Sequence, residues 1–203
     1  MKLLYSPASP FVRKVMMAAH ELGLVGRIAC VDAAAHPVNR DANIIRHNPL
    51  GQVPTLLLDN GEVLYDSDVI CQYLQDIAGG HALIPAGGID RLRCLRDQAL
   101  GDGIMNAALL VRFERALRTE EMRNRGWESG QLGKIDTGLA FLETQAKGMT
   151  GRVDLATISY VCALGYIDFR LPDIDWGSKY PVLAAWYAGW ADRPSFAATT
   201  PKG

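Results

Sequence analysis

Short apolar runs alternate with amphipathic stretches in the first part of the chain. Residues 2–5 are a short apolar strand, and from Pro10 apolar residues recur at helical spacing until Gly23. Further strands are predicted at 27–31, 54–58 and 62–64, with a turn at 59–61 joining the last two into a hairpin. Helices are predicted at 41–46 and 67–77. The order βαβ followed by ββα predicts a mixed sheet that contains one parallel pair.

A different pattern follows a break that is rich in glycine and proline, at 79–80 and 85–88. Beyond it we predict helices only, at 91–118 with interruptions at Gly101 and Gly103, then at 128–147, 154–169 and 180–192. The stretch 154–169 is apolar nearly all round, as in a central buried helix. We therefore expect an α/β domain in residues 1–79, a linker in 80–88, and an all-α helical bundle domain in 89–203.

The composition is that of a soluble globular protein, with 49% hydrophobic and 21% charged residues among 203. A net charge of −1 without any basic run argues against a nucleic-acid partner. The apolar start is too short for a signal peptide, and no apolar run is long enough to cross a membrane. The four cysteines are widely spaced and lack zinc spacing, so we expect a cytoplasmic protein with reduced thiols and no metal.

The first segment that could carry chemistry is Ser9-Pro10, where a strand gives way to a helix. Serine suits the cap and proline the first helical position, so Ser9 has a sufficient structural role. The same position also favours an anion, because the helix dipole and free N–H groups point there. A serine hydroxyl that donates to a thiolate lowers the pKa of that thiol.

Two further segments share this double interpretation. Residues 48–55 form a turn before a strand, and a cis bond at Pro54 would expose the backbone of Val53 for strand-like pairing with an extended peptide. Asp66-Ser67 opens the next helix, where the two residues serve as a cap. They also suit an amino acid: Asp66 for its ammonium group, and the Ser67 N–H and hydroxyl for its carboxylate.

Taken together and in this order, these segments resemble the glutathione transferase family, and in particular its bacterial members. The resemblance extends to residues 154–157, 180–186 and 193–196 and so covers nearly the whole chain. It implies a thioredoxin-like domain that binds glutathione, a helical domain that holds the acceptor, and a homodimer. The cap at 154–157 departs from the family pattern because Asp154 precedes Thr157 instead of following a Ser or Thr.

The resemblance also implies roles for single residues. Val53 would pair with the cysteinyl part of glutathione ahead of a cis Pro54, and Asp66 and Ser67 would hold the γ-glutamyl end. Further candidates are Gln52 near the ligand, Arg40 and His36 for the glycyl carboxylate, and Asp102 for the site of the partner subunit. The expected walls of an acceptor pocket between the domains, each also a plain core candidate, are Met105, Leu109, Phe113 and Phe169.

Ser9 stands where some relatives carry a cysteine, and a hydroxyl cannot form a mixed disulfide, so thiol–disulfide exchange is not expected. Tyr5, where other classes place a catalytic tyrosine, and Ser6 remain alternatives to Ser9. The expected activity is a glutathione S-transferase acting on small hydrophobic electrophiles, typical of detoxification. Two other functions stay open: a glutathione-dependent isomerase or lyase, and a non-catalytic protein that binds glutathione or another ligand.

Overall fold

The computed structural model describes residues 1–201, which form two compact units. The first, here called the sheet unit, comprises residues 1–92 together with 194–201, and the second, the helical unit, comprises 93–193. The predicted domain limits at 79 and 89 stay a prediction, and the last two residues of the predicted helical domain, 202 and 203, lie outside the described residues.

The sheet unit contains one mixed sheet, as predicted. Its strands within residues 1–201 are β1 (Lys2–Tyr5), β2 (Ala29–Asp32), β3 (Thr55–Leu57) and β4 (Val63–Leu64), in the order β2-β1-β3-β4. β1 pairs with β2 in parallel, while β3 is antiparallel to both β1 and β4. The predicted hairpin is therefore present, and the predicted second strand begins two residues later than expected.

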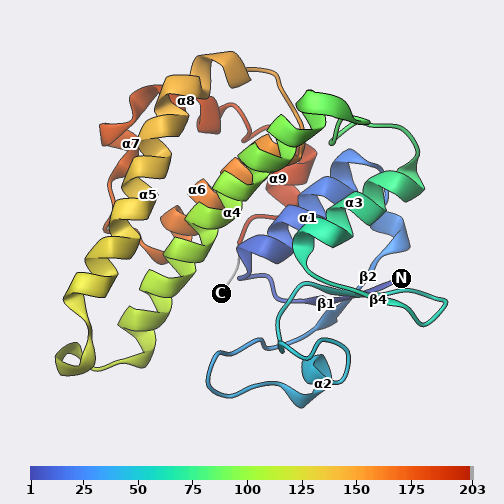
Figure 1. Ribbon diagram of the computed structural model, residues 1–203, viewed down its shortest axis with the longest axis horizontal. Coiled ribbons are helices and arrows are strands. Elements are labelled where there is room, and N and C mark those ends of the chain that lie inside the picture. Colours follow the sequence, from blue (N-terminus) through green and yellow to red (C-terminus); the bar gives the residue numbers. More distant parts are fainter. Residues whose placement is uncertain (202–203) are drawn as a thin grey trace. The chain divides into compact units, whose positions relative to one another are not determined.

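Helices cover both faces of this sheet (Figure 1). They are α1 (Pro10–Glu21), α2 (Ala42–Ile45), α3 (Ser67–Ala78) and α9 (Pro194–Ala198), with a 3-10 turn, η1, at Val25–Arg27. α1 and α3 lie side by side on one face, and α2 lies on the other. α9 packs on α1, where the Arg13 guanidinium lies 4.7 Å from the Phe196 ring centroid and Ser195 donates a hydrogen bond to Glu21.

The helical unit contains no strand within the described residues, as expected. Its elements are α4 (Gly88–Leu117, which begins in the sheet unit), η2 (Glu120–Met122), α5 (Arg125–Gln145), η3 (Ala146–Met149), α6 (Leu155–Arg170), α7 (Trp176–Lys179) and α8 (Pro181–Ala188). Every residue of α6 from Leu155 to Ile167 is buried, which confirms the predicted central helix. Its cap is reciprocal: Thr157 N–H donates to Asp154 Oδ1 at 2.9 Å, and Asp154 N–H donates to Thr157 Oγ1 at 3.0 Å.

The predicted interruption of the long helix at Gly101 and Gly103 is wrong, because α4 runs unbroken through both. Gly101 is buried, and a Cβ built on it would lie 2.7 Å from Ser159 Cβ and 2.9 Å from the Ser159 carbonyl carbon. A Cβ on Gly103 would meet nothing within 4 Å. Gly101 therefore allows α4 and α6 to approach closely, and the helix continues because its packing outweighs the low helix propensity of these two glycines.

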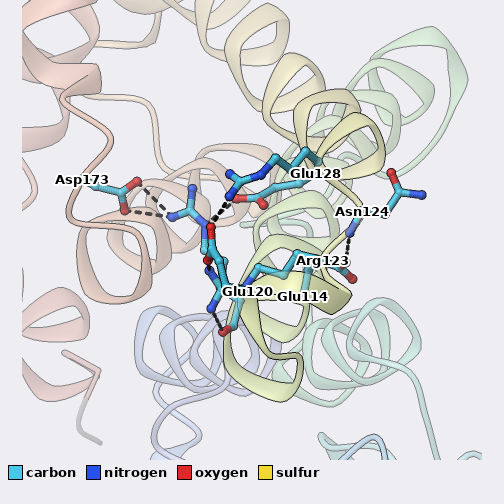
Figure 2. A network of polar contacts seen from close by, with 8 residues as sticks. Glu114, Glu120, Arg123, Asn124, Glu128 and Asp173 are labelled. Atoms are coloured by element: carbon cyan, nitrogen blue, oxygen red, sulfur yellow. Dashed lines mark hydrogen bonds and ion pairs between the residues drawn. The ribbon is translucent and has the colours of Figure 1, made fainter.

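A network of charged side chains holds the corner between α4 and α5 (Figure 2). Arg115 donates through Nε to Glu128 at 2.6 Å and through Nη1 to both carboxylate oxygens of Asp173 at 2.9 Å. Arg123 donates to the Arg115 carbonyl at 2.7 Å. The backbone N–H of Asn124 donates to Glu114 at 2.7 Å. These contacts join α4, the turn at 118–124, α5 and the segment after α6.

Candidate functional site

The three segments singled out in the sequence meet at one end of the sheet. Leu4 pairs with Thr55 in antiparallel register, so the end of β1 lies beside the start of β3. Leu56 pairs with Leu64, again antiparallel, so the end of β4 lies at the same end of the sheet. The residues that follow β1, precede β3 and follow β4 are therefore neighbours. We call this end of the sheet the sheet-edge site.

The dimensions of this edge match a short extended peptide. β1 and β4 are separated by β3, and two steps between neighbouring strands span about 10 Å. Three extended residues cover about 10 Å at roughly 3.4 Å each. One tripeptide can therefore reach from the start of α1 to the start of α3.

Ser9 lies at the N-terminus of α1, as predicted. Its hydroxyl oxygen accepts from Val12 N–H at 3.3 Å, and Pro10 occupies the first turn. The backbone N–H of Ser9 donates to the Ser6 carbonyl at 3.0 Å, and this bond closes the tight turn between β1 and α1. The Ser9 hydroxyl proton is not used by the capping bond, so the side chain retains a donor at a helix N-terminus.

Tyr5, the alternative to Ser9, ends β1 and is partly exposed. Burial raises the pKa of its phenol, and the neighbouring Cys30 and Asp32 on β2 raise it further. Tyr5 therefore stays protonated well above neutral pH. Its neighbours are Asp32, which is a carboxylate, and Cys30, which becomes negative only when its thiol ionises.

The turn before β3 presents the backbone of Val53. The Val53–Pro54 bond is cis, as the resemblance implied. No hydrogen bond within residues 1–201 uses the backbone N–H or C=O of Val53. These two groups are therefore available to pair with an extended ligand.

Asn48 holds this turn in place, a role that the sequence reasoning missed. Its side chain is buried, donates to the Gln52 carbonyl at 3.2 Å and to Thr55 Oγ1 at 3.1 Å, and accepts from Leu50 N–H at 3.0 Å. Thr55 also donates to the Gln52 carbonyl, at 2.9 Å. The Gln52 side chain itself is exposed. The signal that could have found this role is an asparagine at the start of a turn, because its side chain often accepts the backbone N–H two residues on.

The third segment forms the N-terminus of α3. Asp66 is the cap and accepts from Asp68 N–H at 3.1 Å, and Ser67 is only 3% exposed. In the part of the chain that the structure describes, the Ser67 hydroxyl has no hydrogen-bond partner. Asp68 also receives the fully buried ammonium of Lys14 from α1, at 2.5 Å. This ion pair, which the sequence did not predict, ties the two helix N-termini together.

His36 and Arg40, between β2 and α2, make bonds within their own loop. His36 Nδ1 accepts the backbone N–H groups of Val38 and Asn39 at 3.2 and 2.9 Å. Arg40 donates through Nη2 to the Pro49 carbonyl at 2.6 Å, next to the turn that carries Val53. Both side chains thus shape the loop, and their predicted contact with a ligand stays a prediction.

The other predicted residues belong to the helical unit. Asp102 on α4 is half-buried and accepts from Gln98 Nε2 at 3.4 Å. Met105 is fully buried, as the plain core interpretation expects, while Leu109 and Phe113 are half-buried. Phe169 is also half-buried, with the Arg170 guanidinium 4.0 Å from its ring centroid. The predicted acceptor pocket stays a prediction.

Two other features are absent from the residues that the structure describes. Among residues 1–201, no group of three or more histidine, cysteine, aspartate or glutamate side chains is arranged to hold a metal ion. None of the described helices combines the length and apolar character needed to cross a membrane.

Comparison with known proteins gives matches along almost the whole chain. A model of the glutathione S-transferase N-terminal domain matches residues 8–77, and a model of the corresponding C-terminal domain matches residues 106–189. An Escherichia coli K12 protein named "Uncharacterized GST-like protein YibF" is 34% identical, with 99% of this chain and 98% of that protein covered.

Two solved structures are more similar still. A crystal structure of a glutathione transferase family member from Pseudomonas fluorescens Pf-5 with bound glutathione is 48% identical with a TM-score of 0.96, and covers 100% of this chain and 99% of the other. A second structure of a family member from the same organism, with bound S-(propanoic acid)-glutathione, is 46% identical with a TM-score of 0.92 and covers 99% of each chain.

Proposed function

Since the chain belongs to the glutathione S-transferase family, we propose that it binds glutathione at the sheet-edge site and transfers it to a small electrophile. The observation that carries the proposal is the relative with bound glutathione, 48% identical over all of this chain. The geometry supports it, because the sheet-edge site combines two helix N-termini with an unpaired backbone segment, at the spacing of one tripeptide.

In this proposal each segment binds one part of glutathione. The backbone of Val53 pairs with the cysteinyl residue, while Ser67 binds the γ-glutamyl carboxylate and Asp66 its ammonium group. The fit rests on the free Val53 N–H and C=O and on the unpartnered Ser67 hydroxyl within residues 1–201. Gln52, Arg40 and His36 border the remaining, glycyl end.

Ser9 activates the thiol in this mechanism by donating a hydrogen bond from its hydroxyl group to the sulfur, while the thiol releases its own proton to solvent. A hydrogen bond to the thiolate and the N-terminal dipole of α1 both favour the charged form, so the pKa of the thiol falls. The sulfur then attacks an electrophilic carbon, forms a thioether and expels the leaving group, or adds to a double bond. The protein residue acts as activator, and the nucleophile belongs to glutathione.

Tyr5 is the weaker candidate for this role because of its surroundings. The Asp32 carboxylate, one of the groups that raise the pKa of Tyr5, disfavours another negative charge nearby. Ser9 has a helix N-terminus instead, which stabilises an anion. Ser6 sits in the turn between them and stays the third candidate.

For the acceptor, the relative that binds S-(propanoic acid)-glutathione supports a short carboxylated chain on the sulfur. We therefore favour small electrophiles, among them unsaturated acids, with Leu109, Phe113, Phe169 and Met105 as candidate walls of their pocket. A detoxifying role, a cytoplasmic location and a homodimer in which Asp102 reaches the partner's site belong to the same proposal. An isomerase or lyase, or a non-catalytic binding protein, would use the same glutathione contacts.

Substitution of Ser9 by Gly and by Ala tests the activator. Both remove the hydroxyl, but Gly costs the helix cap only a few tenths of a kcal/mol while Ala costs about 1 kcal/mol. We expect both variants to lose turnover equally, to keep glutathione affinity, and to shift the pH–rate profile upward. Turnover with an aryl halide and with an unsaturated acid, alongside calorimetry with reduced glutathione, measures this. Unchanged turnover in Ser9→Gly would transfer the role to Tyr5, and absence of glutathione binding by the unsubstituted protein would refute the proposal.

A further inference from the structure

We propose that the electrophile taken by this chain carries an acidic group, which is bound by Arg112, Arg170 and the Tyr166 hydroxyl. This rests on the proposed function, because it names the class of acceptor that the helical unit holds. Arg112 lies on α4, and Tyr166 and Arg170 lie on α6, so all three side chains belong to the helical unit.

The packing of α4 on α6 brings these side chains together. The two helices touch at Gly101, where a Cβ would lie 2.7 Å from Ser159 Cβ. Residues 112 and 170 each lie eleven positions beyond that contact, or about 16 Å along a helix. Because α4 and α6 run in the same direction (Figure 1), positions 112 and 170 come to the same level along the two helices.

The positive charges of Arg112 and Arg170 are not neutralised by the chain. Both side chains are half-buried, and neither guanidinium makes an ion pair or a hydrogen bond with any of residues 1–201. The Arg170 guanidinium contacts only the Phe169 ring in this way, and such a contact leaves its N–H groups able to donate. Arg115, one turn further along α4, is by contrast already paired with two carboxylates. Arg112 and Arg170 can therefore both bind an anion.

Tyr166 adds a buried hydroxyl group that has no partner. Its side chain is only 3% exposed, and its hydroxyl makes no hydrogen bond with the described residues. Burial raises the pKa of this phenol, while the charges of Arg170 and Arg112 act in the opposite direction, so both cations lie near it. A buried hydroxyl without a partner is costly, and a bound acid group would accept its hydrogen bond.

Apolar side chains on the same helix faces indicate the rest of the ligand. Leu109 lies one turn before Arg112 and Phe113, and Phe169 lies one turn after Tyr166. These apolar side chains are half-buried. An acceptor with an apolar body and one carboxylate or sulfonate would contact both kinds of side chain. A neutral acceptor would leave the two guanidinium groups without an anion, and an inorganic anion has no electrophilic carbon.

Chloronitrobenzoate, with its chlorine para to the carboxylate, is an acceptor of this class. The sulfur of glutathione would form a bond to the carbon that carries chlorine, chloride would leave with the bonding pair, and the thiol proton would pass to solvent. The carboxylate takes no part in the reaction and serves for binding. The matched neutral acceptor is the corresponding carboxamide, which differs only in that group.

Calorimetric titration of the full chain with the glutathione adducts of these two acceptors tests the proposal. We expect the acid adduct to bind about tenfold more tightly than the carboxamide adduct. Arg112→Met should remove most of this preference and Arg112→Lys only part of it, while Tyr166→Phe should reduce it by about threefold. Arg27→Met, which removes an exposed cation of the sheet unit, should leave it unchanged.

The ratio of the two affinities separates recognition of the acid group from structural damage, which would weaken both adducts alike. Equal affinities in a protein that binds reduced glutathione would overturn the acidic acceptor and leave the proposed function standing. A preference for the acid adduct that survives both Arg112→Met and Arg170→Met would overturn it as well. Absence of binding by reduced glutathione and by both adducts would instead refute the proposed function, and the acidic acceptor with it.

Discussion

Two glycines of α4, only two residues apart, are expected to respond to the same substitution in opposite directions. Replacing a helical glycine by alanine gains about 0.5–1 kcal/mol, because the unfolded chain loses conformational freedom. Gly103 is exposed and a new Cβ meets nothing within 4 Å, so Gly103→Ala should stabilise the protein by this amount. Gly101→Ala receives the same helical gain but must also accommodate a contact with α6.

The cost at Gly101 follows from the atoms that the new Cβ would meet. Ser159 Cβ lies at 2.7 Å and the Ser159 carbonyl carbon at 2.9 Å, and neither is the far end of a flexible side chain. Overpacking of this kind typically costs about 1–3 kcal/mol. Because the helical gain is common to both variants, their difference in unfolding free energy should equal this packing cost.

Urea unfolding followed by far-ultraviolet circular dichroism measures both variants against the unsubstituted chain at equal protein concentration. Ser159→Gly in the Gly101→Ala background removes one of the two clashing atoms and should recover part of the loss, as a double-mutant cycle reports. Equal shifts in the free energy of unfolding for Gly101→Ala and Gly103→Ala would contradict a packing cost at Gly101. A stabilising effect of Gly101→Ala would contradict that packing cost as well.

Three further outcomes are expected. Asn48→Ala removes three hydrogen bonds around the turn before β3, so it should cost about 1–3 kcal/mol in urea unfolding and weaken glutathione binding in calorimetry; unchanged affinity would separate the turn from the site. Burial and the charge of Asp32 raise the pKa of the exposed Cys30 thiol, so its alkylation should be slow near neutral pH and accelerate as pH rises; Asp32→Asn should speed it, and equal rates by mass spectrometry would contradict the assigned cause. Glu128→Gln weakens the hydrogen bond from Arg115 at the corner between α4 and α5, and it should lower the unfolding free energy in urea by about 1 kcal/mol. An unchanged unfolding free energy would show that the bonds from Arg115 to Asp173 hold this corner without Glu128.

The sequence was informative where a local pattern determines the structure. The strand at 2–5, the cap at Ser9 and the hairpin after Pro54 follow from periodicity and turn chemistry, and all three are present in the fold. Their joint position at one edge of the sheet was expected only through the resemblance to a family. The register of β1 with β3 and of β3 with β4 confirms this joint position. It could not be read from the residues alone, because no local pattern specifies which strands become neighbours.

Features that depend on distant parts of the chain could not be predicted in this way. The ion pair between Lys14 and Asp68 joins residues 54 positions apart, and a lysine in an amphipathic helix gives no sign that it will be fully buried. Gly101 was misinterpreted for the same reason. Its neighbour Ser159 lies on another helix, so the sequence offered only the local meaning of glycine, a helix breaker.

The alternative between helix cap and binding residue, which the sequence left open at Ser9 and Asp66, does not require a choice. A capping hydroxyl accepts a backbone N–H through its oxygen lone pair and keeps its own proton, so Ser9 can cap α1 and still donate to a thiolate. Likewise, the Oδ1 that accepts Asp68 N–H leaves Asp66 a second carboxylate oxygen for an ammonium group. The two demands are also alike in geometry, because a cap places a polar side chain where the helix dipole favours an anion. A residue selected as a good cap at the sheet edge is thereby already oriented for the proposed ligand.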